Sequence, residues 1–217
     1  MRHLIAAFML AGLLDASTAT ADRSQVYSIQ GVDCADCGTP IKSGLKKLKG
    51  VKKSAFDIHK VEITVTMDDR VTDQAVLDVI AQSGPGFKGT VGPGQGAYLP
   101  LETYPKGADV VMLTESGAAV GPLEKLRLPG KYTVFDVYAD WCGPCRVVDA
   151  KLRELTETRR DIAVRKLNVV DFESPLAREL GAKLKALPYV VVFSPDGRRT
   201  DLMGANTSKL AAALGTR

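Results

Sequence analysis

Four cysteines carry the most informative pattern in this 217-residue chain, because they form two pairs, Cys34 with Cys37 and Cys142 with Cys145, each separated by two residues. The second pair follows an apolar run at 132–138 that has the composition of a buried strand. The residues after Cys145 have helical spacing, which places Cys142 where a strand ends and a helix begins. Unpaired N–H groups and the helix dipole stabilise an anion there, which lowers the pKa of the Cys142 thiol and makes it a nucleophile.

Cys145 is expected about one helical turn further on, close enough to attack a mixed disulfide formed at Cys142. The alternative interpretation of this pair is a structural disulfide or a zinc site. A CxxC motif beside a strand–helix junction is the signature of thiol–disulfide exchange, so the position of the pair favours redox chemistry.

The segment 138–145, with the sequence YADWCGPC, contains the motif WCGPC and resembles the active site of thioredoxins. It also resembles the reducing thioredoxin-like domains of Gram-negative bacteria that face the periplasm. The resemblance implies that Cys142 attacks a substrate disulfide and that Cys145 resolves the mixed disulfide. Gly143-Pro144 is the dipeptide of the reducing thioredoxins, which implies a low reduction potential.

Further residues match the thioredoxin pattern in chain order. Asp136 matches the buried acid that accepts a proton from the resolving cysteine, and Lys166 matches the lysine that pairs with this acid. Asp136 could instead be a buried acid with a chance partner, but the presence of Lys166 favours the proton-relay role. Pro188 matches the active-site proline, and the resemblance implies a cis bond from Leu187, whereas a strand-start proline is the ordinary alternative. Gly204 matches a glycine beside the substrate groove.

The first residues have the layout of a signal peptide. Arg2 and His3 precede an uncharged apolar run at 4–14, and Ala19-Thr20-Ala21 offers a small-residue cleavage site. The run is shorter than the ~20 residues that a membrane-spanning helix needs, which argues against an uncleaved N-terminal anchor. We therefore expect residues 1–21 to be removed and the mature protein to be soluble and periplasmic, in an oxidising compartment.

The apolar spacing over 22–92 predicts the order strand–helix–strand–strand–helix–strand, which is the α+β ferredoxin-like (βαββαβ) arrangement. The first cysteine pair falls in the loop after the first strand. A CxxC motif at that place resembles the heavy-metal-associated domains of copper chaperones, metal-pumping ATPases and mercury-binding periplasmic proteins. Gly31 and Phe87 match that family, whereas Val32 and Asp33 replace its methionine and its small hydroxyl residue.

Cys34 and Cys37 are therefore the predicted metal ligands. Two thiolates on a flexible loop favour soft ions, and we expect Cu(I) first, with Hg(II) and Zn(II) as alternatives. After removal of residues 1–21, His59 is the one histidine left, which excludes a site built on several imidazoles. Asp33 and Asp36 could add oxygen ligands for zinc, or simply solvate the loop or cap a helix. The competing interpretation of the pair is a purely redox or structural disulfide.

The formal net charge of the chain is +4, and lysines gather after the first cysteine pair, at positions 42, 46, 47, 49, 52 and 53. A solvated helix face is the ordinary interpretation of such a cluster. The functional interpretation is a positive surface that stabilises the thiolates and steers a metal-transfer partner with an acidic surface. Nucleic acid is not an expected partner, because aromatic residues are not interleaved with the lysines.

Residues 93–107 are rich in glycine and proline, which predicts a linker long enough for the two CxxC sites to meet. Beyond it, residues 108–217 alternate strands and helices in the pattern of a small α/β fold with helices on both sheet faces. The resemblance identifies this part as a thioredoxin fold. Ser174 is the expected N-cap of one of its helices, and Pro195-Asp196-Gly197 is an expected hairpin turn.

These observations predict an exported thiol–disulfide oxidoreductase that acts as a protein-disulfide reductase and needs no cofactor for its redox chemistry. Its expected partners are protein disulfide or dithiol substrates and an electron donor in the membrane. The alternative is a periplasmic metallochaperone for Cu(I), Hg(II) or Zn(II). In that case the thioredoxin domain keeps metal-binding thiols reduced, either its own or those of a partner.

Overall fold

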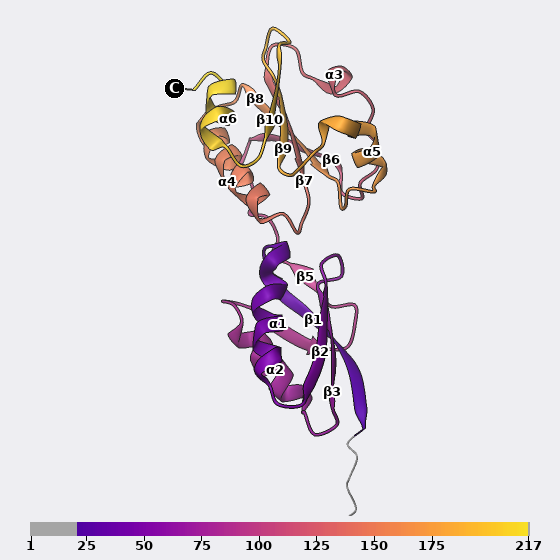
Figure 1. Cartoon of the computed structure of the whole chain (residues 1–217). Helices are drawn as coiled ribbons and strands as arrows, with labels where there is room; N and C mark the ends of the chain where they lie inside the picture. The colour runs from indigo at the N-terminus through magenta and orange to yellow at the C-terminus, as the bar shows by residue number, and fades with distance from the viewer. Residues whose placement is uncertain (1–20, 217) are drawn as a thin grey trace, which may run out of the picture.

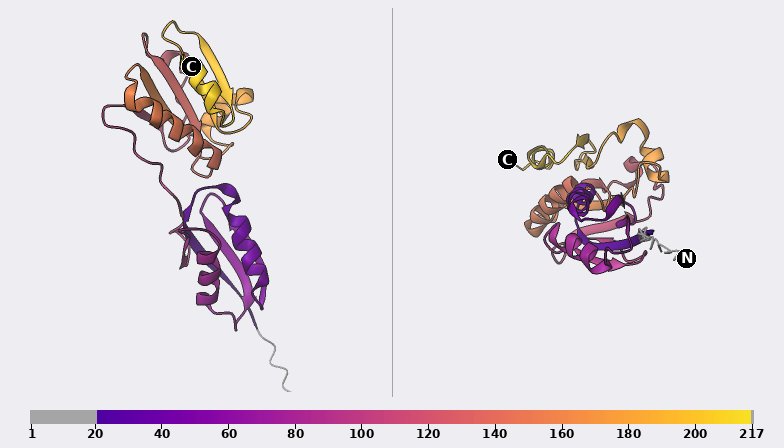
Figure 2. Two further views of the ribbon diagram at one scale, coloured as in Figure 1. Left: turned by 90° about the vertical axis from the view of Figure 1, so that its left-hand side faces the viewer. Right: turned by 60° about the horizontal axis from the view of Figure 1, so that its bottom comes forward.

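The computed structural model describes residues 21–216, so the predicted signal peptide, apart from Ala21, lies outside the described residues. Two domains follow one another along the chain (Figure 1). An extended segment passes from the first domain to the second, as the left view in Figure 2 shows. Within the part of the chain that is described, no helix combines the length and the apolar character needed to cross a membrane.

The first domain is a four-stranded antiparallel sheet with helices, in the strand order β2-β3-β1-β4. This order and the sequence of elements confirm the predicted ferredoxin-like fold. The elements are β1 (Asp22–Val32), η1 (Ala35–Cys37), α1 (Gly38–Lys47), β2 (Val51–Asp57), β3 (Glu62–Asp68), α2 (Asp73–Gln82) and β4 (Lys88–Val91).

Apolar side chains from both helices and from alternating strand positions form the core of this domain. Ile41 and Leu45 of α1 are fully buried against it, as are Val76 and Ile80 of α2. These pairs are four residues apart, which puts both members on one face of a helix. The hydroxyl of Thr72 caps α2 by accepting a hydrogen bond from the Ala75 amide at 3.2 Å.

The predicted linker contributes a strand of its own to the first sheet. β5 (Ala97–Tyr98) pairs in parallel with β1, and the Leu99 amide donates to the Val32 carbonyl at 2.7 Å. The Tyr98 hydroxyl also donates to the carbonyl of Ile58. The beginning of the segment 93–107 is therefore held against the first domain.

The second domain is a mixed five-stranded sheet in the order β10-β9-β7-β8-β6. β6, β8 and β7 are parallel, whereas β9 and β10 run antiparallel to their neighbours. The strands are β6 (Asp109–Thr114), β7 (Tyr132–Tyr138), β8 (Ile162–Asn168), β9 (Tyr189–Phe193) and β10 (Arg199–Met203). The helices are α3 (Leu123–Leu126), α4 (Gly143–Thr158), α5 (Pro175–Leu180), η2 (Gly181–Lys183) and α6 (Thr207–Ala213).

Helices cover both faces of this sheet, which confirms the predicted thioredoxin fold. Val134 of β7 belongs to the core beneath α4 and α6, whereas its neighbour Phe135 belongs to the core on the side of α3 and α5. Because successive strand residues point to opposite faces, Asp136 lies on the same face as Val134, beneath α4. The Ser174 hydroxyl accepts from the Ala177 amide at 3.1 Å, which confirms it as the N-cap of α5.

Candidate functional site

Cys142 is the N-cap residue of α4, directly after the turn that follows β7. The Cys145 amide donates to the Cys142 carbonyl at 3.0 Å and approaches its Sγ at 3.2 Å. The two cysteines form a disulfide, and both are buried. A sulfur that receives a helix N-terminal amide is placed where negative charge is stabilised, so the reduced form of this pair is suited to nucleophilic chemistry.

Pro188 directly precedes β9, and its peptide bond to Leu187 is cis, the form that the resemblance implies. The carbonyl of Pro188 accepts a hydrogen bond from the Gly204 amide at 2.8 Å. Gly204 has a positive φ of 80°, a conformation that favours glycine. The residues that match the active-site proline and the glycine beside the substrate groove are thus hydrogen bonded to each other.

A buried ionic cluster lies beneath α4. Lys166 Nζ is 2.6 Å from Asp136 Oδ2 and 2.6 Å from Asp149 Oδ1, and all three residues are at most 4% exposed. Asp136 and Lys166 face one another because they are register partners on the parallel strands β7 and β8. A charged amine shared by two carboxylates stays protonated, which keeps the buried charges compensated.

The electrostatics of this cluster raise the pKa of one of its carboxyl groups. Burial raises the pKa of Asp136, although Lys166 opposes that effect. Burial alone would lower the pKa of Lys166, but the two carboxylates beside it raise that pKa overall. The Oδ1 atom of Asp136 is buried and has no hydrogen-bond partner among the described residues. A protonated Asp136 would place its proton on such an oxygen, which makes this carboxyl a candidate for proton exchange.

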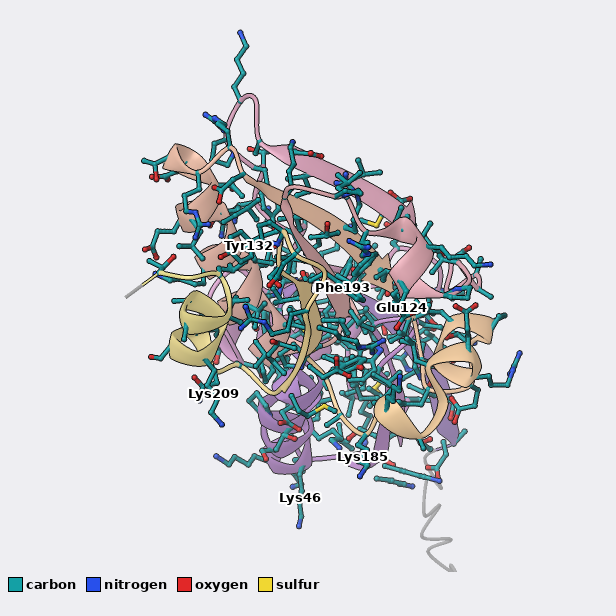
Figure 3. All side chains as sticks on the ribbon, turned by 90° about the horizontal axis from the view of Figure 1, so that it is seen from above. Lys46, Glu124, Tyr132, Lys185, Phe193 and Lys209 are labelled. Carbon is teal, nitrogen blue, oxygen red and sulfur yellow. A yellow bond between two sulfur atoms is a disulfide. The ribbon has the colours of Figure 1, made fainter. Side chains whose placement is uncertain are left out.

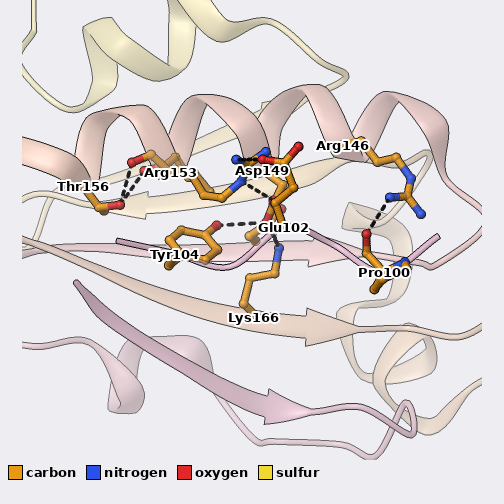
Figure 4. Close-up of polar contacts among 10 residues, drawn as sticks. Pro100, Glu102, Tyr104, Arg146, Asp149, Arg153, Thr156 and Lys166 are labelled. Carbon is orange, nitrogen blue, oxygen red and sulfur yellow. Dashed lines mark hydrogen bonds and ion pairs between the residues drawn. The ribbon is translucent and has the colours of Figure 1, made fainter. Parts of the chain in front are cut away.

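Asp149 and the residues that contact it, apart from Lys166, were not among the predicted site residues. Asp149 of α4 accepts hydrogen bonds from Lys166 and from the Tyr104 hydroxyl, the latter at 3.0 Å (Figure 4). Arg153 also contacts Asp149, at 3.2 Å, and pairs with Glu102. Tyr104 and Glu102 come from the segment predicted as linker, so that segment closes the cluster from outside.

The sequence could have indicated Asp149, because it lies on the apolar face of α4. It follows Val148 and is one helical turn before Leu152, and both of these side chains are buried. A carboxylate at such a position needs a buried partner. Tyr104 carries no comparable signal, because its neighbours in the sequence have no periodic pattern.

Cys34 and Cys37 form the second disulfide, at the loop between β1 and α1. Asp33 Oδ1 lies 3.2 Å from Cys37 Sγ, and ligand atoms of Asp33, Cys34 and Cys37 lie within 4.8 Å of one another. Asp36 lines the same surface pocket but does not join this group. Once reduced, two thiolates and one carboxylate make a donor set that suits a soft or borderline ion such as Cu(I), Hg(II) or Zn(II).

Gly31 fixes the chain path into this loop. It has a φ of 87°, and a Cβ placed on it would lie 2.3 Å from the carbonyl oxygen of Gly86. Any other residue would therefore push the β1 end away from the segment that leads to β4. Phe87, the second residue of the family match, is buried beside Gly84 and lines the pocket of the cysteine loop.

The six lysines after the first cysteine pair are all exposed. Lys46, for example, extends from α1 into solvent (Figure 3). Lys52 pairs with Asp22 and Asp68, which neutralises part of the positive charge. The six lysines therefore lie on a solvated face, and those of α1 give this side of the domain a positive surface.

The structure also brings the two cysteine pairs together. The amide of Ala35 donates to the carbonyl of Trp141 at 2.9 Å, which joins the two CxxC loops directly. A Cβ placed on Gly143 would lie 3.1 Å from Cys34 Cβ. The predicted metal ligands and the predicted nucleophile therefore meet at the contact between the domains.

Comparisons with known proteins match two separate parts of the chain. A family model described as Heavy-metal-associated domain matches residues 26–85, and one described as Thioredoxin matches residues 124–216. Thioredoxin from Coprinus comatus is 37% identical over 93 residues, which are 42% of this chain and 84% of that protein. Chloroplastic thioredoxin F2 from Arabidopsis thaliana is 34% identical over 84 residues, which are 39% of this chain but 44% of that protein. The chain thus spans less than half the length of this plant relative.

Solved structures resemble each domain separately. The short form of thioredoxin F from spinach chloroplast is 27% identical, with a TM-score of 0.39, over 50% of this chain and 92% of that one. Oxidized MerP from Ralstonia metallidurans CH34 is 25% identical, with a TM-score of 0.30, over 33% of this chain and 97% of that one. The two family matches and the two CxxC pairs support a redox role and a metal-binding role.

Proposed function

Because the chain belongs to the thioredoxin family and carries a heavy-metal-associated domain ahead of its thioredoxin domain, we propose that it is an exported thiol–disulfide oxidoreductase that acts as a reductant. The observation that carries this proposal is the position of Cys142 at the start of α4, where its Sγ receives the Cys145 amide. The heavy-metal-associated domain adds a site for a soft metal ion.

In the proposed reaction the Cys142 thiolate attacks a substrate disulfide, and a mixed disulfide forms as one substrate sulfur leaves. Cys145 then gives its proton to Asp136, directly or through water, and attacks Cys142 Sγ. The substrate leaves as a dithiol and the Cys142–Cys145 disulfide remains. Burial raises the pKa of Asp136, which makes the carboxylate a stronger base, and Lys166 holds it in place.

Export to the periplasm rests on the pattern of residues 1–21, with its short apolar run and its small-residue cleavage site. In an oxidising compartment a reductant must be supplied with electrons. We therefore propose a thiol–disulfide donor in the membrane that returns the Cys142–Cys145 pair to the dithiol form. Protein disulfides are the proposed substrates.

The reductase activity is tested with insulin and dithiothreitol. We expect the wild-type chain to accelerate insulin reduction above the rate with dithiothreitol alone, because Cys142 supplies a thiolate at neutral pH. The same property predicts that iodoacetamide at mildly acidic pH alkylates Cys142 faster than a cysteine in an unstructured peptide. Equal alkylation rates, or insulin reduction no faster than with dithiothreitol alone, would contradict the proposal.

The second candidate function is a metallochaperone, and the carboxylate beside the first cysteine pair favours it. Asp33 Oδ1 and the two sulfurs form a compact, open donor set on the surface of the domain, which suits transfer of an ion to a partner. The proposed cargo is Cu(I), with Hg(II) and Zn(II) as the alternatives. In this function the thioredoxin domain keeps metal-binding thiols reduced, because a disulfide cannot bind the ion.

Metal binding is tested on the full chain with Cys142→Ser and Cys145→Ser, which leaves one thiol pair. We expect the reduced double variant to bind one Cu(I) ion in competition with a chromophoric chelator. Adding Cys34→Ser should abolish that binding, because one thiolate and a carboxylate are a poor soft-metal site. Asp33→Asn removes the proposed oxygen ligand and should weaken binding, whereas Asp36→Asn, the matched control, should leave the affinity unchanged. Loss of affinity with the Asp36 variant alone would contradict the proposed ligand set.

A further inference from the structure

We propose that the Cys34–Cys37 disulfide of the same chain is a substrate of the thioredoxin domain, reached through a Cys142–Cys34 mixed disulfide, and that Arg146 holds the two loops in register. This inference rests on the proposed function, since it names a substrate for the same nucleophile. The contacts between the two CxxC loops carry it.

Each neighbour of Cys34 is hydrogen bonded to a residue that flanks the other cysteine pair. The carbonyl of Asp33 accepts from Arg146 Nε at 3.1 Å, and the amide of Ala35 donates to the carbonyl of Trp141 at 2.9 Å. Trp141 immediately precedes Cys142, and Arg146 immediately follows Cys145. The backbone of each residue next to Cys34 is therefore hydrogen bonded to a residue that flanks the Cys142–Cys145 pair. The partner is the Trp141 backbone in one case and the Arg146 side chain in the other.

The same geometry selects Cys34 over Cys37 as the sulfur under attack. Cys34 is half-buried, and its Cβ lies in the contact with Gly143, which has no side chain to hold it away. Cys37 is buried in the first domain, as the residue before α1, and lies against Asp33. Cys37 is thus placed as the leaving sulfur.

Arg146 joins the two domains because its charged guanidinium donates hydrogen bonds to backbone carbonyl oxygens. Besides Asp33, its guanidinium donates to the carbonyl of Leu99 and, at 3.4 Å, to that of Pro100 (Figure 4). Leu99 is itself bonded to Val32 of β1. One side chain of α4 therefore joins the cysteine loop and the end of the β5 segment, both of which belong to the first domain. Carbonyl oxygens that receive a charged donor form stronger hydrogen bonds than those between neutral groups.

The transfer balances in sulfur bonds, electrons and protons. The Cys142 thiolate attacks Cys34 Sγ, the Cys34–Cys37 bond breaks, and Cys37 leaves as a thiolate that takes up a proton. Cys145 then loses its proton and attacks Cys142 Sγ, so that Cys34 leaves as a thiolate. Two electrons have moved to the first domain, and the Cys142–Cys145 pair is oxidised. A dithiol donor restores that pair.

The first test asks which sulfur meets Cys142. The full chain carrying Cys37→Ser and Cys145→Ser keeps Cys34 and Cys142, whereas the matched variant with Cys34→Ser and Cys145→Ser keeps Cys37 instead. Both are reduced, oxidised with diamide and digested for mass spectrometry. We expect an intramolecular Cys34–Cys142 disulfide, formed at a rate independent of protein concentration and about tenfold faster than the Cys37–Cys142 disulfide. Equal rates, or bonds between molecules only, overturn the inference.

Arg146→Ala in the first of these variants should slow the Cys34–Cys142 reaction about tenfold, which is the effect of losing roughly one charge-assisted hydrogen bond. Lys151→Ala is the matched control, because Lys151 is a cation on the same helix that pairs with Glu154 and not with the first domain. We expect it to leave the rate unchanged. An unchanged rate with Arg146→Ala removes the proposed role of that residue.

Electron transfer is tested on the oxidised wild-type chain with dithiothreitol. We expect the Cys34–Cys37 disulfide to open about tenfold more slowly when both Cys142 and Cys145 are replaced by serine, because the relay is then missing. Equal opening rates overturn the transfer. Insulin reduction, measured on the same wild-type sample, distinguishes the proposed oxidoreductase activity from the proposed electron transfer to Cys34–Cys37. Insulin reduction without transfer keeps the oxidoreductase and removes this substrate, whereas transfer without insulin reduction confines the activity to the chain's own disulfide.

Discussion

Replacement of Cys142 by serine should lower insulin reduction by at least about 10³-fold, because no other sulfur of the pair is placed to start the exchange. Cys142 is the N-cap of α4 and receives the Cys145 amide, whereas Cys145 lies inside the first turn of the helix. A serine hydroxyl at neutral pH is not ionised and cannot form a disulfide. The measurement is the initial rate of insulin reduction with dithiothreitol, corrected for the reaction without protein.

Cys145→Ser is the matched control for this prediction. It also stops turnover, but it leaves the attacking sulfur in place, so a mixed disulfide with the substrate should accumulate and be visible by mass spectrometry. Cys142→Ser should give no such adduct. An adduct through Cys145 in the Cys142 variant would mean that the order of attack is the reverse of the one proposed.

Asp136→Asn should slow the resolving step on the order of 100-fold, the usual contribution of a positioned general base. The step is measured in a chain that lacks Cys34 and Cys37, as the second phase of thionitrobenzoate release after mixing with Ellman's reagent. Burial raises the pKa of Asp136, so in the wild type the rate should fall as the pH drops through that raised pKa and Asp136 becomes protonated. The Asn variant should lack this pH step.

Asp149→Asn provides a control with the same change in charge and the same lysine partner. The negative charge of Asp149 contributes to the raised pKa of Asp136, so its removal should move the pH step to lower pH and leave the step itself intact. If the Asp149 variant loses the step and the Asp136 variant keeps it, then Asp149 is the proton acceptor.

Strong local patterns made most of the architecture predictable. The apolar run at 132–138 and the cysteine spacing after it place a strand and a helix start, and the structure has β7 and α4 there. The paired helical spacings of Ile41 with Leu45 and of Val76 with Ile80 place the helices of the first domain. In each case a side-chain period repeats over several residues, which makes the pattern hard to produce by chance.

The parts that could not be predicted depend on contacts between distant segments. β5 has two residues, too few for any period, and pairs with β1 across more than sixty positions. Arg146 bonds to backbone carbonyls, which every residue has, so its partners leave no trace in the sequence. Tyr104 closes the ionic cluster from a segment with no periodic pattern. Asp149 is the exception, since a carboxylate on an apolar helix face is a visible anomaly.

The contact of Cys34 with Gly143 also bears on how many partner proteins the chain can bind at the same time. A protein that collects an ion from Cys34 and a protein that offers a disulfide to Cys142 would have to approach neighbouring loops, because the two CxxC loops are hydrogen bonded to each other. Binding of one of these proteins is expected to hinder binding of the other. We therefore expect the two proposed functions, ion delivery and disulfide reduction, to alternate in time.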